Sequence, residues 1–261
     1  MRSPLSRDGN LNVLAVHNLK GGVGKTASAV NLAWLAARSG YKTLLWDLDP
    51  QGAASFYFRI KPKLKGGLGR LLDDSSRVRQ VIKATDYERL DLLPADASFH
   101  NLDIAVDAYK KPHKSIGRLL KPLRRDYHMV FIDCAPGLSL SAESILAAAT
   151  TLLIPTIPTP LSVRALEQVL ELVHDSQLTG LDVLPFFTLV DRRKRVHVTT
   201  IQQFLHGDIT ALAHYIPYAA DVERMGVTRQ VLAQFAPRSS AALAYQSLWT
   251  EIEQRVTARC P

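Results

Sequence analysis

The chain has 261 residues, of which 47% are hydrophobic and 21% are charged, a composition typical of soluble globular proteins with a sizeable buried core. Lysine and arginine together number 32 and aspartate and glutamate 24, so the net charge of +8 is compatible with a polyanionic partner such as DNA. The only two cysteines, Cys134 and Cys260, exclude a disulfide framework and a multi-cysteine metal centre, and they fit a reducing cytoplasm.

No stretch of the sequence predicts a signal peptide or a membrane span. The most apolar long stretch, residues 145–161, is interrupted by Pro155, Pro158 and Pro160. The eight histidines show no metal-ligand spacing. Residues 1–10 are expected to form a flexible leader, and residues 11–261 a single domain.

Residues 13–32 combine an apolar run, a glycine loop and a helical pattern. The apolar run predicts a buried parallel strand, and the helix is expected to begin near Lys25. Glycines between them let backbone N–H groups face phosphate oxygens, while Lys25 reaches phosphate and the Thr26 hydroxyl reaches Mg²⁺. The residues expected to contact a nucleotide here are Gly21, Gly22, Val23, Gly24, Lys25, Thr26 and Ala27.

Two further apolar strands are predicted to end in carboxylates. Residues 43–46 lead to Asp47 and Asp49, which strand alternation places on the same side. Metal binding, water activation and simple loop capping are all open to this pair. Residues 129–132 lead to Asp133, an arrangement in which a carboxylate holds the Mg²⁺ shell.

The remaining pattern predicts alternating helices and strands. Ser162 is the expected N-cap of one helix. The basic, glycine-rich residues 59–70 are expected to form a mobile surface segment or an anion-contact patch. Helices are predicted over residues 26–39, 68–72, 78–84, 115–125, 138–149, 161–172, 199–205 and 241–256, and strands over residues 90–93, 152–155 and 184–190.

The strongest charge run follows the strand predicted at residues 184–190. One acid, Asp191, precedes four successive basic residues. They are Arg192, Arg193, Lys194 and Arg195. Such a cluster can neutralise DNA phosphates without reading sequence, or can be a solvated cationic turn.

A second lysine at the start of the glycine loop, Lys20, gives the motif its particular form. K-G-G-V-G-K-T over residues 20–26 resembles the deviant Walker A loop of the ParA/MinD ATPases. D-L-D-P-Q-G over residues 47–52 resembles the second ATPase motif of the ParA family, and the strand ending in Asp133 resembles its Walker B motif. The resemblance extends from residue 13 to about residue 256, and it is highly specific in these three motifs and loose between them.

The resemblance implies a doubly wound, mostly parallel α/β sheet with helices on both faces, and ATP with Mg²⁺ as cofactors. It implies that Lys20 acts in trans on the nucleotide of a second subunit, much as an arginine finger does. It also implies that Asp49 lies near the attacking water, that Thr26, Asp49 and Asp133 hold the Mg²⁺ shell, and that Pro217 lies near the adenine base.

In several ParA relatives, an arginine in the position of Arg193 contributes to nonspecific DNA binding. Arg224 and Arg229 are further candidates, although Asp221 stands where the family often carries an arginine. The candidate DNA-binding residues, from the charge run and the resemblance together, are therefore Arg192, Arg193, Lys194, Arg195, Arg224 and Arg229.

The function implied is that of a short ParA-like partition ATPase in the cytoplasm, associated with the nucleoid. It would dimerise with ATP, bind DNA nonspecifically, and be released by hydrolysis that a ParB-like protein stimulates. A MinD-type membrane ATPase is disfavoured because residues 248–261 lack a basic amphipathic tail, and an iron–sulfur reductase because bridging cysteines are missing. A positioning ATPase for a non-DNA cargo and a nucleotide-gated scaffold of secretion or polysaccharide machinery stay open.

Overall fold

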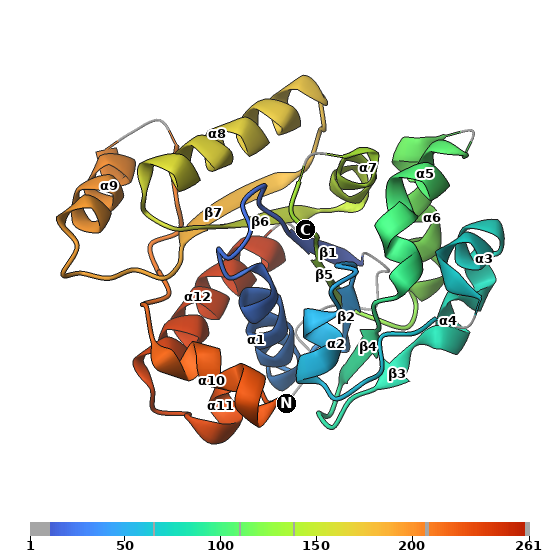
Figure 1. Ribbon diagram of the computed structural model, residues 1–261, viewed down its shortest axis with the longest axis horizontal. Helices are drawn as coiled ribbons and strands as arrows, with labels where there is room; N and C mark the ends of the chain where they lie inside the picture. The colour runs from blue at the N-terminus through green and yellow to red at the C-terminus, as the bar shows by residue number, and fades with distance from the viewer. Residues whose placement is uncertain (1–10, 65, 110, 138, 207–208, 259–261) are drawn as a thin grey trace.

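The computed structural model describes residues 11–64, 66–109, 111–137, 139–206 and 209–258. The residues predicted to form the leader, 1–10, and Cys260 lie outside this described part. A seven-stranded sheet with the order β3-β4-β2-β5-β1-β6-β7 runs through the molecule (Figure 1). The strands are β1 (Asn12–Val16), β2 (Thr43–Asp47), β3 (Lys83–Ala84), β4 (Leu90–Leu93), β5 (Met129–Asp133), β6 (Thr151–Thr156) and β7 (Asp182–Phe187).

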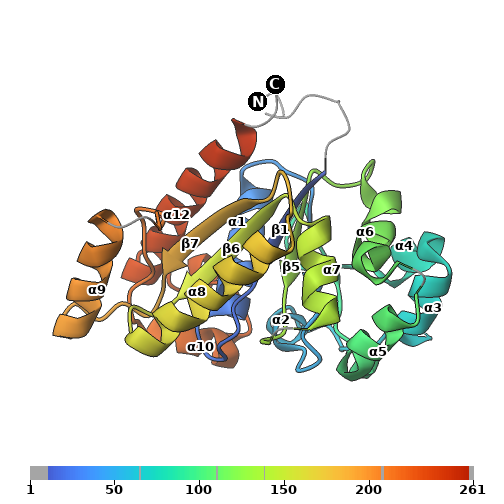
Figure 2. The same cartoon turned by 90° about the horizontal axis from the view of Figure 1, so that it is seen from above.

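All strand pairs are parallel except the pair β3–β4 at one edge. The predicted doubly wound, mostly parallel sheet is confirmed, and helices cover both of its faces (Figures 1 and 2). The helices are α1 (Lys25–Arg38), α2 (Ala53–Tyr57), α3 (Gly67–Asp73), α4 (Val78–Val81), α5 (Leu102–Asp107), α6 (Ser115–Leu120), α7 (Leu140–Ala148), α8 (Pro160–Asp175), α9 (Arg195–His206), α10 (Ala220–Thr228), α11 (Leu232–Phe235) and α12 (Ser240–Thr257). In the described part of the chain, no helix is both long and apolar enough to span a bilayer.

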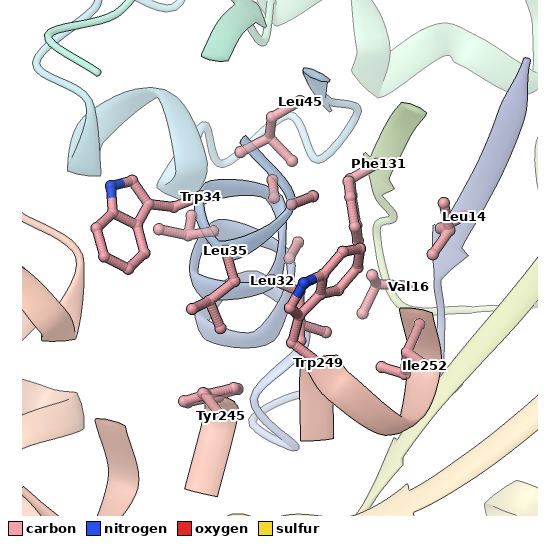
Figure 3. Packing of buried hydrophobic residues seen from close by; sticks show 14 of the residues in the cluster. Leu14, Val16, Leu32, Trp34, Leu35, Leu45, Phe131, Tyr245, Trp249 and Ile252 are labelled. Atoms are coloured by element: carbon pink, nitrogen blue, oxygen red, sulfur yellow. The ribbon is translucent and has the colours of Figure 1, made fainter. Parts of the chain in front are cut away.

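Each face of the sheet has its own hydrophobic core, because successive residues of a strand point to opposite faces. On one face, Phe131 of β5 packs against Trp249 of α12, with ring centroids 6.1 Å apart (Figure 3). The Trp249 indole also donates a hydrogen bond to Ser39, 2.9 Å away at the end of α1. The other core contains alternate strand residues such as Trp46 together with residues of α3, α6, α7 and α8.

Prolines and local hydrogen bonds move several predicted boundaries. Helix α8 begins at Pro160 with Thr159 as N-cap, because proline suits the first helical position, so the prediction of Ser162 as cap was wrong. The Ser162 hydroxyl instead accepts a hydrogen bond from the Ile157 N–H, 3.1 Å away. Helix α6 ends at Leu120, ahead of Pro122, and a 3₁₀ turn (Lys121–Leu123) replaces the predicted continuation.

Three other predicted segments also differ. Residues 78–84 form only the short helix α4 before the chain extends into β3. Strand β7 ends at Phe187, and Leu189 has a left-handed φ of 52°. The segment 59–70 is anchored, since Leu64 and Leu68 are buried and Asp96 accepts a hydrogen bond of 2.7 Å from the Leu64 N–H.

Candidate nucleotide site

The glycine loop leaves the carboxyl end of β1, a strand that lies between β5 and β6. Gly22 and Gly24 have φ angles of 73° and 87°, a left-handed region that glycine adopts without strain. Gly24 is the N-cap of α1 and no side chain caps this helix, so the first N–H groups of α1 face the loop. Gly21 and Gly22 are exposed, whereas Val23 and Ala27 are buried. The loop therefore leads into an uncapped helix N-terminus, the kind of backbone arrangement that suits an anion.

Two side chains from other parts of the chain fix the loop backbone. The Asn18 amide donates to the Pro155 carbonyl, 2.9 Å away on β6, and its oxygen accepts from the Lys20 N–H at 2.9 Å. The Thr188 hydroxyl, just past β7, donates to the Val23 carbonyl at 2.8 Å. These bonds tie the conformation of the loop to the ends of β6 and β7.

Lys25 is 7% exposed, and its ammonium donates to the Lys20 carbonyl at 3.0 Å. Burial lowers the pKa of Lys25, and the nearby carboxylates of Asp133 and Asp49 oppose this shift. An ammonium has three N–H donors, and one is used within the loop. The ammonium is placed to bind an anion while lying near the carboxylates of Asp133 and Asp49.

The carboxyl ends of the neighbouring inner strands β2 and β5 form an acidic edge of the sheet, which consists of Asp47 and Asp133. The two residues are paired in register, and both are fully buried. One oxygen of Asp47 accepts two 2.7 Å hydrogen bonds, from the N–H and the hydroxyl of Ser55. The other Asp47 oxygen and both oxygens of Asp133 are buried without a hydrogen-bond partner among the described residues. Unpaired buried carboxylate oxygens are costly, and a bound cation is one way to satisfy them.

The pKa values at this edge follow from burial. Burial raises the pKa of Asp47 to about 6, with Asp49 adding to the shift and the Ser55 hydrogen bonds opposing it. Burial also raises the pKa of Asp133 well above its usual range, and the Asp47 charge contributes. The Thr26 hydroxyl and Lys25 act in the opposite direction on Asp133, which places both beside it.

These oxygens fit a hard divalent cation such as Mg²⁺, which prefers oxygen ligands and keeps part of its water shell. Among the residues that the structure describes, no group of three or more His, Cys, Asp or Glu side chains is arranged to hold a metal ion. A cation here would therefore need further oxygens, from Thr26, water or a bound phosphate.

Asp49 is half-buried and lies two residues beyond β2. One of its oxygens accepts a 2.9 Å hydrogen bond from the Gln51 N–H, the turn chemistry that the sequence left open for this residue. Asp49 is also close enough to raise the pKa of both Asp47 and Asp133. The structure thus brings Asp49 to the same edge as the glycine loop.

Pro217 forms a parallel bridge with Val190 just beyond β7. Thr188, two residues before Val190, donates a hydrogen bond to Val23 of the glycine loop. Because Pro217 is bridged to Val190, its backbone lies on the same side of the sheet as the loop. The side chain of Pro217 is half-buried.

The predicted cationic turn follows β7 and ends at Arg195, the first residue of α9, and its four basic side chains are exposed. Arg193 makes two hydrogen bonds to Asp191, at 2.9 and 3.0 Å. The Arg192 guanidinium lies 5.7 Å from the ring centroid of Tyr215. Lys194 and Arg195 have no carboxylate partner among the described residues.

The structure does not bring Arg224 and Arg229 into this turn. Arg224 pairs with Asp221 at 2.8 Å, and Arg229 stacks 4.4 Å from the ring centroid of Phe56 while donating to its carbonyl at 2.9 Å. Helix α10, which carries Arg224, is separate from α9 in both views (Figures 1 and 2).

Sequence reasoning missed four residues that shape the site. Asn18 and Thr188 fix the loop, Ser55 holds Asp47, and His17 is a buried group next to the loop. Burial and Lys25 lower the pKa of His17 to about 4, so the ring is neutral at pH 7. A polar Asn18 directly after an apolar strand was a usable signal, whereas the Thr188 contact with Val23 joins residues 165 positions apart and the Ser55 contact with Asp47 depends on how the chain turns after β2.

Comparison with known proteins agrees with this geometry. A family described as an AAA domain matches residues 11–183. The chain is 30% identical over 200 residues to the sporulation initiation inhibitor protein Soj of Bacillus subtilis, covering 73% of this chain and 78% of Soj. The chain belongs to the ParA/MinD ATPase superfamily. The chromosome partitioning protein ParA of Myxococcus xanthus is 29% identical over 73% of this chain and 69% of its own length.

This chain has the same fold as the solved structure of cobyrinic acid a,c-diamide synthase from Mycobacterium smegmatis, which was crystallised with ADP and magnesium. Its TM-score is 0.82 at 25% sequence identity, with 95% of this chain and 96% of the synthase covered. The doubly wound architecture around the loop is therefore shared with a protein that holds a nucleotide and magnesium.

Proposed function

We propose that this chain is a partition ATPase that binds ATP with Mg²⁺, dimerises in that state, and then binds DNA nonspecifically. Hydrolysis releases it, a ParB-like protein stimulates the hydrolysis, and the protein resides on the nucleoid in the cytoplasm. The observation that carries the proposal is the juxtaposition of buried carboxylate oxygens without described partners, one on Asp47 and two on Asp133, with the Lys25 ammonium and the glycine loop. The likeness to Soj and to a chromosome partitioning ParA supports the partition role.

Phosphate binding is proposed for the loop amides from Gly21 to Ala27 and for Lys25, whose remaining donors are free to contact phosphate oxygens. Thr26, Asp49 and Asp133 would hold the Mg²⁺ shell. Bound Mg²⁺ supplies charge neutralisation for phosphoryl transfer.

Two residues are proposed to act on the transfer itself. Asp49 orients the attacking water, and Lys20 of a second subunit offsets the charge that develops on the phosphates. The backbone of Lys20 is held on both sides, by Asn18 at its N–H and by Lys25 at its carbonyl, so its side chain leaves from a fixed position. Pro217 is proposed to contact the adenine base.

DNA contact is proposed for the cationic turn. Arg192, Lys194 and Arg195 have no carboxylate partner among the described residues, and Arg193 is held by Asp191. Arg224 and Arg229 would contribute only after leaving their ring contacts with Phe235 and Phe56.

The test is binding to random-sequence duplex DNA without nucleotide, with ADP and with ATP–Mg²⁺, each across a salt series. We expect binding only with ATP–Mg²⁺, falling steeply with salt because phosphate contacts release counterions. Replacing Arg192, Lys194 and Arg195 with alanine should reduce the salt slope by about three.

The matched control replaces three exposed cations elsewhere with alanine, namely Lys61, Lys83 and Arg164. An equal loss in both triple variants would remove the cationic turn as the DNA site. Absence of DNA binding in every nucleotide state, with ATP hydrolysis retained, would favour a positioning ATPase for a non-DNA cargo. Absence of turnover with ATP, DNA and partners present would favour a nucleotide-gated scaffold.

A further inference from the structure

A groove of about 830 Å³ lies at the end of the sheet opposite the phosphate loop. The groove has an apolar floor, which consists of Leu11, directly before β1, Val13 in β1, and Ala147 and Ala148 at the end of α7. Strand β1 separates this floor from the glycine loop by about 13 Å. In Figure 2, α6 lies near the start of β1, while α2 lies at the opposite end of the sheet.

The rim of the groove is positively charged. Lysine and arginine side chains line it, and all of them are exposed. They are Lys111, Lys114, Arg118, Lys121 and Arg124. Arg118 lies 5.6 Å from the ring centroid of Tyr109, and none of the five is within ion-pair distance of a carboxylate in the described ranges. No acidic side chain is among the described residues that line the groove, so its charge is not compensated.

Three of the cations lie on one continuous helical stretch, and Lys111 and Arg124 flank it directly. The stretch consists of the 3₁₀ turn Pro112–Lys114, helix α6 and the 3₁₀ turn Lys121–Leu123. At 1.5 to 2.0 Å per residue, this stretch is about 20 Å long, which corresponds to three to four turns of a bound helix. An apolar floor bounded by a charged edge of this length is the geometry of helix-in-groove recognition.

We propose that this groove binds an acidic amphipathic helix of a partner protein. Apolar side chains of that helix would pack on Leu11, Val13 and the α7 alanines, and its carboxylates would face the cationic rim. Charge argues against residues 1–10 as the occupant, since they carry Arg2 and Arg7 against a single Asp8. Duplex DNA would leave the apolar floor without a partner. The proposal does not depend on nucleotide or DNA binding, because the groove shares no residue with either proposed site.

The probe is a fluorescent helical peptide of about 14 residues, long enough to span the rim, with leucine on one face and glutamate along its flanks. One comparison peptide has glutamine in place of glutamate, and another has serine in place of leucine. Anisotropy with the full chain should show binding only of the glutamate–leucine peptide. Lys114→Glu with Lys121→Glu should weaken that binding at least tenfold, and the bulky neutral Ala147→Trp should also weaken it.

The matched control is Lys61→Glu with Lys83→Glu, which changes the net charge equally at exposed sites away from the groove. It should bind the peptide as the wild type does apart from a small general charge effect, and circular dichroism checks that each variant folds. The proposal is overturned if the peptide does not bind at millimolar concentration, or if the serine peptide binds equally well. It is also overturned if both charge variants lose binding alike, or if the groove variant loses duplex DNA binding and keeps the peptide.

Discussion

Replacing Asp133 with asparagine should stabilise the protein in the absence of nucleotide and metal. Asp133 is fully buried, its oxygens accept no hydrogen bond of good geometry from the described residues although the Thr26 hydroxyl lies near them, and Asp47 lies beside it in register. A pKa shift of one unit corresponds to about 1.4 kcal/mol, and the pKa of Asp47 alone is raised from 3.8 to about 6. The pKa of Asp133 is shifted in the same direction.

Asparagine removes one charge from this pair, and its amide N–H groups can donate to the free Asp47 oxygen. We therefore expect a gain of about 2 kcal/mol in the free energy of unfolding at pH 7, or roughly 5 °C in Tm for a chain of this length. The gain should shrink as pH falls toward 4, because a carboxyl whose folded pKa is raised takes up a proton in the native state and loses its penalty.

The assay is urea unfolding with EDTA at pH 7 and at pH 4.5, followed by thermal unfolding with and without ATP–Mg²⁺. Asp96→Asn is the matched control, since the Asp96 oxygens accept hydrogen bonds from the Leu64 and Ser98 N–H groups and its pKa is lowered. That control should lose about 1 kcal/mol. An Asp133→Asn variant less stable than the wild type at pH 7 without metal would refute the reasoning, as would full stabilisation of that variant by ATP–Mg²⁺.

Other predictions concern the loop and its neighbours. Lys25→Ala should abolish ATP binding in equilibrium dialysis, whereas Lys20→Ala should keep binding but lose ATP-dependent dimers and turnover; a normally dimerising and hydrolysing Lys20 variant would exclude the role in trans. Thr188→Val should cost about 1 kcal/mol in urea unfolding, because the Val23 carbonyl loses its hydrogen bond, and unchanged stability would contradict this. His17 is held neutral by its pKa of about 4, so its contribution is present above pH 6.5 and lost as pH falls to 4. The wild type should lose about 3 kcal/mol relative to His17→Ala between pH 7 and pH 4, and parallel pH profiles would contradict the assignment.

The sequence was sufficient to predict the elements that position the site. Strands ending at Val16, Asp47 and Asp133 follow from short apolar runs, and a glycine loop leading into a helix near Lys25 follows from the loop pattern. These are local signals, because the apolar periodicity and the glycine lie within a few residues of the structure that they specify.

The supports of the site were not predictable in this way. Asn18 bonds to Pro155 and Thr188 to Val23, and each pair is separated by more than a hundred residues. The same is true of Arg229, whose ring contact with Phe56 cannot be read from its neighbours in sequence. Such contacts depend on the strand order, which local patterns do not encode.

The strand order also bears on how the chain acquires its structure during synthesis. Strands β1 and β2 are not neighbours in the sheet, and both pair with β5, which lies more than eighty residues beyond either of them. A nascent chain that has not yet exposed residues 129–133 already contains the whole glycine loop. It still lacks β5, the strand that lies between β1 and β2 in the sheet. Pairing over such separations is slow because a long segment of chain must be closed first. The emerging amino-terminal half therefore presents β1 without any partner strand and β2 with only β4, and we expect it to require shielding until β5 leaves the ribosome.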